Sequence, residues 1–169
     1  MRELREGNID ALDGIYELTS KGVYILAYSI LKNAEKAKDV MQDTFLRAAA
    51  NIGQYKPGTN PKAWISVIAR NAAYREYNNA KRIVCQDFSE HIIDKNVNET
   101  MWTDNIILND ALQTLTAQER EIVSLFAAQG YKHREIAQIV GRPIGTIQWL
   151  YNRAVKKMRK NTETKKHEE

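Results

Sequence analysis

Apolar side chains recur at intervals of three and four along most of the chain, the spacing that places them on one face of an α-helix. In the first half of the sequence this pattern covers residues 8–31, 34–51 and 60–82. Asn8 is a suitable N-cap for the first stretch, and Gly22 is predicted to interrupt it because glycine is a poor helix former. No sustained alternation typical of a β-strand is present. The pattern therefore predicts an all-α fold.

The periodic pattern disappears between residues 86 and 105, where acidic side chains accumulate. We interpret this segment as a flexible acidic linker between two small helical domains. The predicted division is a first domain over residues 1–85, a linker over 86–105, a second domain over 106–160 and a basic, polar tail over 161–169.

An N-terminal capping motif predicts where one helix of the second domain begins. Thr116 and Glu119 have the spacing of a capping box, and Phe126 and Ala127 are expected among the inward-facing residues of the helix that follows. His133 begins the next helix and is expected to be a surface or capping residue.

Residues 133–160 predict a helix-turn-helix. Its first helix covers residues 133–140, Gly141 suits the left-handed turn, and Pro143 suits the first turn of the second helix. Such a unit places its second helix in the major groove of DNA.

Composition and charge narrow the possible functions. The chain has 169 residues, one cysteine and a net charge of +4. Its first residues are charged and no long apolar run is present, so we expect neither secretion nor membrane insertion but a reducing cytoplasm. Residues 56–85 carry a net +5, residues 86–110 a net −5 and residues 132–169 a net +6. Two basic blocks flanking an acidic one predict two separate contacts with nucleic acid.

The helix expected after Pro61 carries cations and aromatic rings along one polar face. Arg70, Tyr74, Tyr77 and Lys81 cluster there, and this combination suits phosphates and exposed bases. The loop over residues 53–60 contains a Pro-Gly turn and lacks the Lys-Ser/Thr pair of a triphosphate-binding loop.

A different surface is predicted for residues 34–51. Asp39, Gln42, Asp43 and Leu46 follow one another at i, i+3, i+4 and i+7 and so form one exposed stripe. A leucine within an acidic row favours a surface that docks on another protein over a merely solvated face.

No catalytic constellation is found, and we expect a protein that is not an enzyme and uses no cofactor or metal. The histidines at 91, 133 and 167 are scattered, without the spacing of a zinc site.

Two blocks of this sequence, in this order, resemble the bacterial RNA polymerase sigma factors of the sigma-70 family, in their extracytoplasmic-function (ECF) group. Residues 37–47 (AKDVMQDTFLR) and 63–71 (AWISVIARN) are similar to region 2 of these proteins. Residues 115–123 (LTAQEREIV) and 145–154 (GTIQWLYNRA) are similar to region 4.

The resemblance implies a role for each surface. The acidic stripe would dock on the clamp helices of the largest polymerase subunit, and region 4 would meet the flap region. An anti-sigma factor, in some cases one that holds its partner at the membrane, is typical of the group. Contacts with the minus-ten element would come from Tyr55, Lys56, Asn60, Lys62, Trp64, Arg70, Tyr74, Tyr77 and Lys81. Contacts with the minus-thirty-five element would come from Arg142, Gly145, Thr146, Gln148, Trp149, Asn152, Arg153 and Lys156.

The sequence departs from the family pattern at several positions. Lys38 replaces an acid beside Asp39, and Ala49 and Ala50 stand where an aromatic-basic pair is frequent. At the reading face, residues 148–150 (QWL) replace the usual Lys-Ser-Arg, so the promoter sequence does not follow from the resemblance.

Two alternative functions belong to other classes. A stand-alone helix-turn-helix regulator would bind DNA without polymerase, and it would not need the stripe around Leu46. A sigma-like interaction module would bind a partner without melting DNA, and it would not need the stripe around Tyr74.

Overall fold

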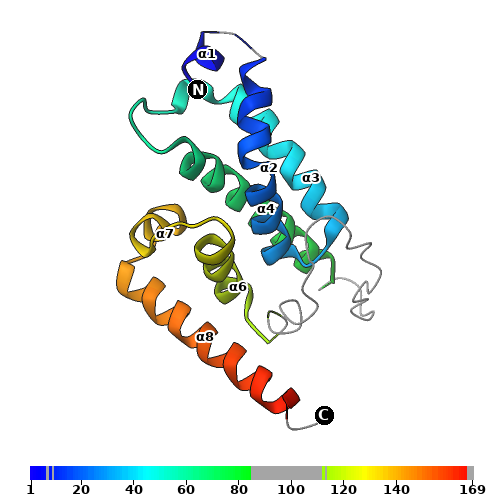
Figure 1. Ribbon diagram of the computed structural model, residues 1–169. Coiled ribbons are helices and arrows are strands. Elements are labelled where there is room, and N and C mark those ends of the chain that lie inside the picture. Colours follow the sequence, from blue (N-terminus) through cyan, green and yellow to red (C-terminus); the bar gives the residue numbers. More distant parts are fainter. Residues whose placement is uncertain (7, 9, 85–111, 113, 167–169) are drawn as a thin grey trace. The chain divides into compact units, whose positions relative to one another are not determined.

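The structure, a computed structural model, describes residues 1–6, 8, 10–84, 112 and 114–166 (Figure 1). The chain forms two compact units, Met1–Glu90 and His91–Glu169. Every regular element of the described residues is a helix, which confirms the all-α prediction. The predicted linker at 86–105 lies outside the described residues.

The first unit is a bundle of three long helices with two short elements at one end. In chain order the elements are α1 (Arg2–Arg5), α2 (Ala11–Leu31), α3 (Ala34–Ala50), the 3-10 helix η1 (Ile52–Gln54) and α4 (Pro61–Val84). Each long helix packs against the other two, as Figure 1 shows. Leu26, Phe45 and Ile65 are among the buried side chains at this centre, one from each helix. Burying each contributes roughly 1.5–3 kcal/mol and fixes which helix face remains outside.

Gly22 does not interrupt the first stretch, so the prediction of two helices there is wrong. α2 is continuous, because a glycine costs a helix only about 1 kcal/mol whereas Val23 and Leu26 beside it are buried in the core. Asn8 lies outside the helix, where its Oδ1 accepts a hydrogen bond from the backbone N–H of Asp10 at 3.1 Å. Asp10 occupies the N-cap position instead.

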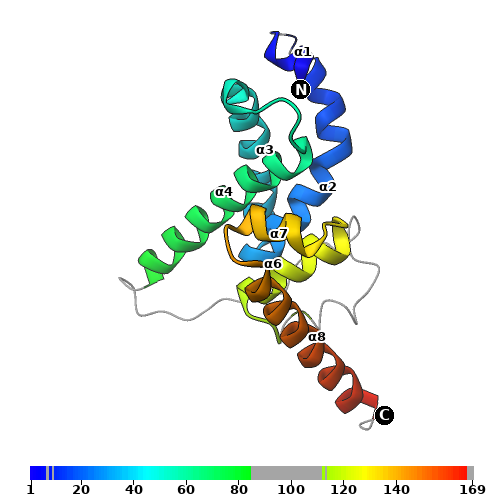
Figure 2. The ribbon, with the colours of Figure 1, turned by 90° about the vertical axis from the view of Figure 1, so that its left-hand side faces the viewer.

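The second unit is assembled around its last helix. In chain order it contains α6 (Ala117–Val123), the π-helix η2 (Ser124–Ala128), α7 (His133–Val140) and α8 (Ile144–Lys166). α6 and α7 both pack against α8, and the C-terminal part of α8 continues beyond them (Figure 2). Ile122, Leu125, Ile136 and Ile147 are fully buried and form the centre of this packing.

The π-helix changes which residues of this stretch face inward. Leu125 is fully buried, Phe126 is half-buried and Ala127 is exposed, so the prediction that Ala127 faces the core is wrong. A π turn adds one residue per turn, which rotates the side chains that follow it. Gly130, with a φ of +73°, then ends the stretch.

The turn between α7 and α8 has the geometry that the sequence predicts. Gly141 adopts a φ of +70°, and its N–H donates a hydrogen bond to the carbonyl of Ala137 at 2.9 Å. This left-handed C-cap stops α7 and turns the chain sharply into α8.

Gly141→Ala should destabilise the second unit by about 1–2 kcal/mol, since only the backbone conformation opposes a Cβ at this position. Gly145→Ala is the matched control, because Gly145 has ordinary helical geometry and an equally open surrounding, and it should be neutral or slightly stabilising. Urea unfolding followed by far-ultraviolet circular dichroism measures both. Equal losses from the two substitutions would contradict the role given to the left-handed turn.

Candidate functional site

The predicted docking stripe lies along one accessible face of α3. Asp39, Gln42 and Leu46 are exposed, and the side chain of Leu46 keeps 69% of its surface accessible. Asp43 is half-exposed and accepts a hydrogen bond from Arg47 Nε at 2.5 Å. The opposite face of α3, which includes Val40 and Phe45, is buried and fixes the stripe outward.

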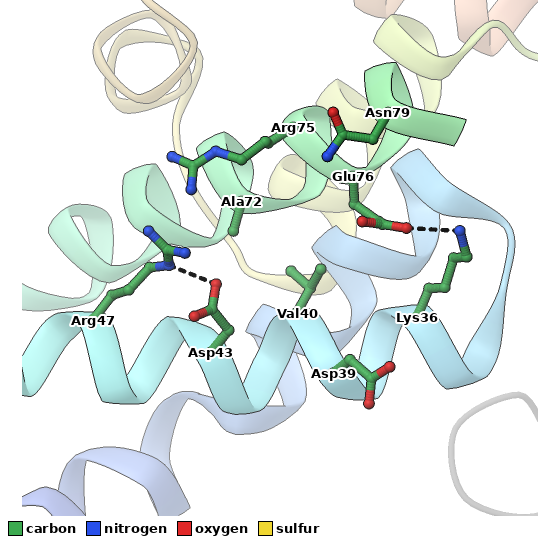
Figure 3. Close-up of a pocket in the computed structure, with 9 residues that line it drawn as sticks. All are labelled: Lys36, Asp39, Val40, Asp43, Arg47, Ala72, Arg75, Glu76 and Asn79. Atoms are coloured by element: carbon green, nitrogen blue, oxygen red, sulfur yellow. Dashed lines mark hydrogen bonds and ion pairs between the residues drawn. The ribbon is translucent and has the colours of Figure 1, made fainter. Parts of the chain in front are cut away.

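Beside the stripe, α3 and α4 enclose an open groove of about 330 Å³ (Figure 3). Val40 and Ala72 contribute apolar surface to it, and charged side chains surround them. Lys36 Nζ donates to Glu76 Oε1 at 2.6 Å across the two helices. The groove is lined by Lys36, Asp39, Val40, Asp43, Arg47, Ala72, Arg75, Glu76 and Asn79. The sequence pattern does not reveal the contribution of α4 to this groove, because the register of α4 against α3 is a tertiary property.

Tyr55 makes contacts that hold the loop before α4 together. Its ring is buried and meets Trp64 edge-on, with 5.5 Å between ring centres, and its hydroxyl donates to the carbonyl of Thr59 at 2.6 Å. Gly58 has a φ of +84°, as the third position of a type II turn requires. Tyr55 therefore holds the shape of the loop, while Lys56 at its tip is exposed.

The start of α4 uses some of the predicted contact residues for its own structure. Asn60 Oδ1 accepts a hydrogen bond from the backbone N–H of Ala63 at 3.3 Å. Lys62 and Trp64 are half-buried.

Further along α4 the predicted basic-aromatic stripe forms a continuous ladder. The guanidinium carbon of Arg70 lies 4.8 Å from the centre of the Tyr74 ring, and Lys81 Nζ lies 4.8 Å from that of Tyr77. The two tyrosine rings meet edge-to-face at 6.4 Å. We call these four residues the α4 ladder. Arg70, Tyr74 and Tyr77 are half-buried and Lys81 is exposed, and each cation stabilises its ring by about 0.5–1 kcal/mol at such a partly exposed site.

On the outer face of α8 the structure brings the predicted residues together. Thr146 is half-buried, whereas Gly145, Gln148, Trp149, Asn152, Arg153 and Lys156 are exposed. Arg142 is also exposed but lies in the turn before α8, where it donates a hydrogen bond to Gln118 Oε1 at 3.3 Å. Ile147, Leu150 and Ala154 point into the core and thereby set this rotation of the helix.

Glu119 on α6 is a fully buried carboxylate that contacts this helix. Lys157 Nζ donates to its Oε2 at 2.8 Å, and Arg153 Nε forms an ion pair with Oε1 at 2.8 Å. The backbone N–H of Thr116 also donates to Oε2 at 2.8 Å, which completes the predicted capping box. The sequence revealed the cap but not the two cations.

Burial alone would raise the pKa of the Glu119 carboxyl. The hydrogen bonds from Lys157 and Thr116 and the charge of Lys157 outweigh that effect and hold the pKa below its ordinary value. Glu119 is therefore an anion at neutral pH, and it is surrounded by the groups that compensate its burial.

His133 is not a surface or capping residue, so that expectation is wrong. Its ring stacks on Phe126 with 5.0 Å between centres and meets Tyr151 at 5.0 Å. This cluster packs the start of α7 onto α8.

In the part of the chain that the structure describes, no cluster of three His, Cys, Asp or Glu side chains is able to bind a metal ion. None of the helices in this part is both long and apolar enough to cross a membrane.

Comparison with known proteins gives a consistent picture. The sequence profile of Sigma-70 region 2 matches residues 15–83, and that of Sigma-70, region 4 matches residues 106–158. Over 134 residues the chain is 33% identical to the ECF RNA polymerase sigma factor EcfG of Rhodopseudomonas palustris (strain TIE-1), which covers 78% of this chain and 74% of that protein. It is 27% identical over 162 residues to the RNA polymerase sigma factor CarQ of Myxococcus xanthus, with 94% and 93% covered.

A solved structure shows the same architecture. The sigma factor RpoE of Bartonella quintana, crystallised in complex with the anti-sigma factor NepR, superposes with a TM-score of 0.81 and 27% identity. The match covers 92% of this chain and 98% of that chain.

Glu119→Gln should remove a pH-dependent part of the stability of the second unit. Because folding lowers the pKa of this carboxyl, its contribution is fully present above the unfolded value of about 4.3 and is lost as the pH falls through the folded value. We expect the stability difference between parent and variant to be largest near pH 7 and to shrink towards pH 3. Thermal unfolding across this range measures it, and a constant difference at every pH would contradict the assignment.

Proposed function

Since the chain belongs to the sigma-70 family and is an ECF RNA polymerase sigma factor, we propose which of its surfaces contact core polymerase and which contact promoter DNA. The first unit docks on core polymerase and opens the minus-ten element. The second unit binds the minus-thirty-five element. The observation that carries this proposal is that one unit bears both an exposed stripe on α3 and the basic-aromatic ladder on α4.

Docking is assigned to Asp39, Gln42, Asp43 and Leu46, and its target to the clamp helices of the largest polymerase subunit. Single exposed leucines are ordinary on protein surfaces. Leu46, however, lies in line with three polar side chains and next to a groove lined by charges of both signs. An apolar contact ringed by charged groups is the usual anatomy of a protein interface. The groove adds Arg75 and Glu76 of α4 to the surface that a partner helix would meet.

Minus-ten recognition is assigned to the loop before α4 and to the α4 ladder. Lys56 at the loop tip is assigned to a phosphate, and Tyr55 and Asn60 shape the loop and the helix start behind it. Tyr74 and Tyr77 offer ring surface for bases that leave the duplex. Arg70 and Lys81, beside these rings, supply the positive charge that follows the backbone.

Minus-thirty-five recognition is assigned to the outer face of α8. Gln148 and Asn152 are one turn apart, and each offers an amide able to pair with the edge of adenine. Lys156 is exposed and is assigned to a phosphate. Arg153 is not assigned to a phosphate, since it is already paired with Glu119.

Protein partners beyond the clamp helices are also proposed. Contact of the second unit with the flap region rests on family membership. Control by an anti-sigma factor is supported by the solved complex of the Bartonella quintana protein with one. Because polymerase and promoter DNA are its other proposed partners, we assign the protein to the cytoplasm.

Transcription with core polymerase tests the proposed function and its docking surface together. The parent chain should direct run-off transcription from genomic promoter fragments. Leu46→Asp should abolish it and weaken co-purification with core enzyme by about tenfold or more, because it places a charge in the apolar centre of the contact. Leu18→Asp is the matched control, since Leu18 on α2 is 84% exposed and lies outside the stripe.

The control variant should remain fully active. Equal loss of activity in Leu18→Asp and Leu46→Asp would contradict the docking assignment. DNA binding by the parent chain without any transcription would instead favour a stand-alone regulator.

The α4 ladder should matter more for opening DNA than for finding it. Replacing Tyr74 and Tyr77 with alanine should leave initial binding to duplex promoter nearly unchanged, because stacked bases are not available to the rings. It should weaken the open complex by about 1–3 kcal/mol for each base that can no longer stack on a ring. Permanganate footprinting of unpaired thymines measures opening, and equal reactivity with parent and variant would return the tyrosines to a packing role.

A further inference from the structure

A fully buried carboxylate holds the outer face of the proposed reading helix. Glu119 lies on α6, outside the helix-turn-helix, yet its two oxygens each meet a cation of α8. Lys157 and Arg153 are four residues apart and reach it from the same side of the helix. Nothing in a helix cap requires either cation, because Thr116 already completes the cap.

The two cations differ in what lies on their other side. The guanidinium carbon of Arg153 lies 5.0 Å from the centre of the Trp149 ring, at cation–π distance. Arg153 is 43% exposed and Trp149 is 57% exposed, so both sit at the surface that would face DNA. A chain of contacts thus runs from the core to that surface through Glu119, Arg153 and Trp149.

We propose that Glu119 is a positioning residue for recognition of the upstream promoter element, and that it acts through Arg153 to fix the indole of Trp149. The proposal rests on the proposed function, in which α8 reads the major groove. The indole of Trp149 is an apolar surface in a row of amide and cationic side chains. In the major groove such a surface suits contact with the methyl group of thymine. Glu119 thereby makes Trp149 a specificity residue.

The physical reason is preorganisation. An exposed tryptophan that samples several rotamers loses that freedom when it binds, and this loss weakens discrimination between bases. Arg153 limits the rotamers of Trp149, and Glu119 limits those of Arg153. The same ion pair keeps Arg153 from a phosphate. Removing the carboxylate should therefore reduce sequence discrimination and at the same time increase the dependence of binding on salt.

The test uses holoenzyme formed with core polymerase and a promoter fragment first selected from random upstream sequences by the parent protein. Binding to this fragment is compared with binding to fragments that differ at one upstream base pair, across a series of salt concentrations. The variants are Trp149→Ala, Glu119→Gln and Arg153→Gln. Lys157→Gln is the matched control, because it removes the other cation of Glu119 and leaves the contact between Arg153 and Trp149 in place.

We expect Trp149→Ala to reduce discrimination by about tenfold at a thymine-containing pair. Glu119→Gln and Arg153→Gln should reduce it at the same pair and should add little to Trp149→Ala when combined with it. Glu119→Gln alone should also steepen the salt dependence by about one phosphate contact. Lys157→Gln should lower thermal stability and keep the discrimination.

The outcomes separate this proposal from the proposed function. If Trp149→Ala discriminates like the parent, the assignment of Trp149 to the reading face is wrong, and this proposal falls with it. If Trp149→Ala loses discrimination while Glu119→Gln and Arg153→Gln keep it, only the present proposal is overturned. A uniform loss of affinity in Glu119→Gln, with an unchanged salt slope, also overturns it. Arg153→Gln, at an exposed position, answers the question if Glu119→Gln fails to fold.

Discussion

Burial of one face of each helix is the constraint on which the proposed interfaces depend. α3 cannot rotate without exposing Ala37 and Phe45, and α8 cannot rotate without exposing Ile147 and Ala154. Each large apolar side chain opposes such a rotation with roughly 1.5–3 kcal/mol, so several together fix the helix in place. The polar faces are therefore presented in a single orientation. Rigid presentation of this kind is what a docking or reading surface needs.

In the second unit, a buried carboxylate also constrains how the helices pack. A buried carboxylate would be costly alone, yet Glu119 is compensated by a cap at one end and by two cations from α8. Its position is thereby tied to the register between α6 and α8, since a shift of either helix would leave the charge without its partners. Arg153 and Lys157 remain partly exposed, so they can turn to solvent if the carboxylate is removed. Glu119 therefore contributes to the geometry of the second unit as well as to its stability.

Apolar periodicity predicted the long helices and the exposed stripe on α3, and the identity of Gly141 predicted the turn, because these features depend on residues close in sequence. The expectations that proved wrong concern what happens between elements. Packing around Val23 and Leu26 overrides the helix-breaking tendency of Gly22. The π turn at Ser124–Ala128 rotates Ala127 outward. The spacing of apolar residues does not predict the hydrogen bonding of a π turn. The contacts of Glu119 with residues more than thirty positions away were equally out of reach, because sequence spacing says nothing about which helices meet.

The same local motif recurs on both proposed nucleic-acid surfaces, in that a cation lies over an aromatic ring. Arg70 lies over Tyr74, Lys81 over Tyr77 and Arg153 over Trp149. A cation that lies over a ring is also attracted by a nearby phosphate, so its contact with the ring and its contact with the backbone are coupled. Energies assigned to the two contacts separately would therefore not add. On α4, movement of Lys81 to a phosphate would free one face of the Tyr77 ring, which would favour stacking after backbone contact in the proposed open complex. On α8, Glu119 opposes such a movement of Arg153, which keeps the tryptophan covered and in place. A cation held by a buried carboxylate in this way suits the role proposed for the outer face of α8, which is to read paired bases with a side chain of fixed orientation.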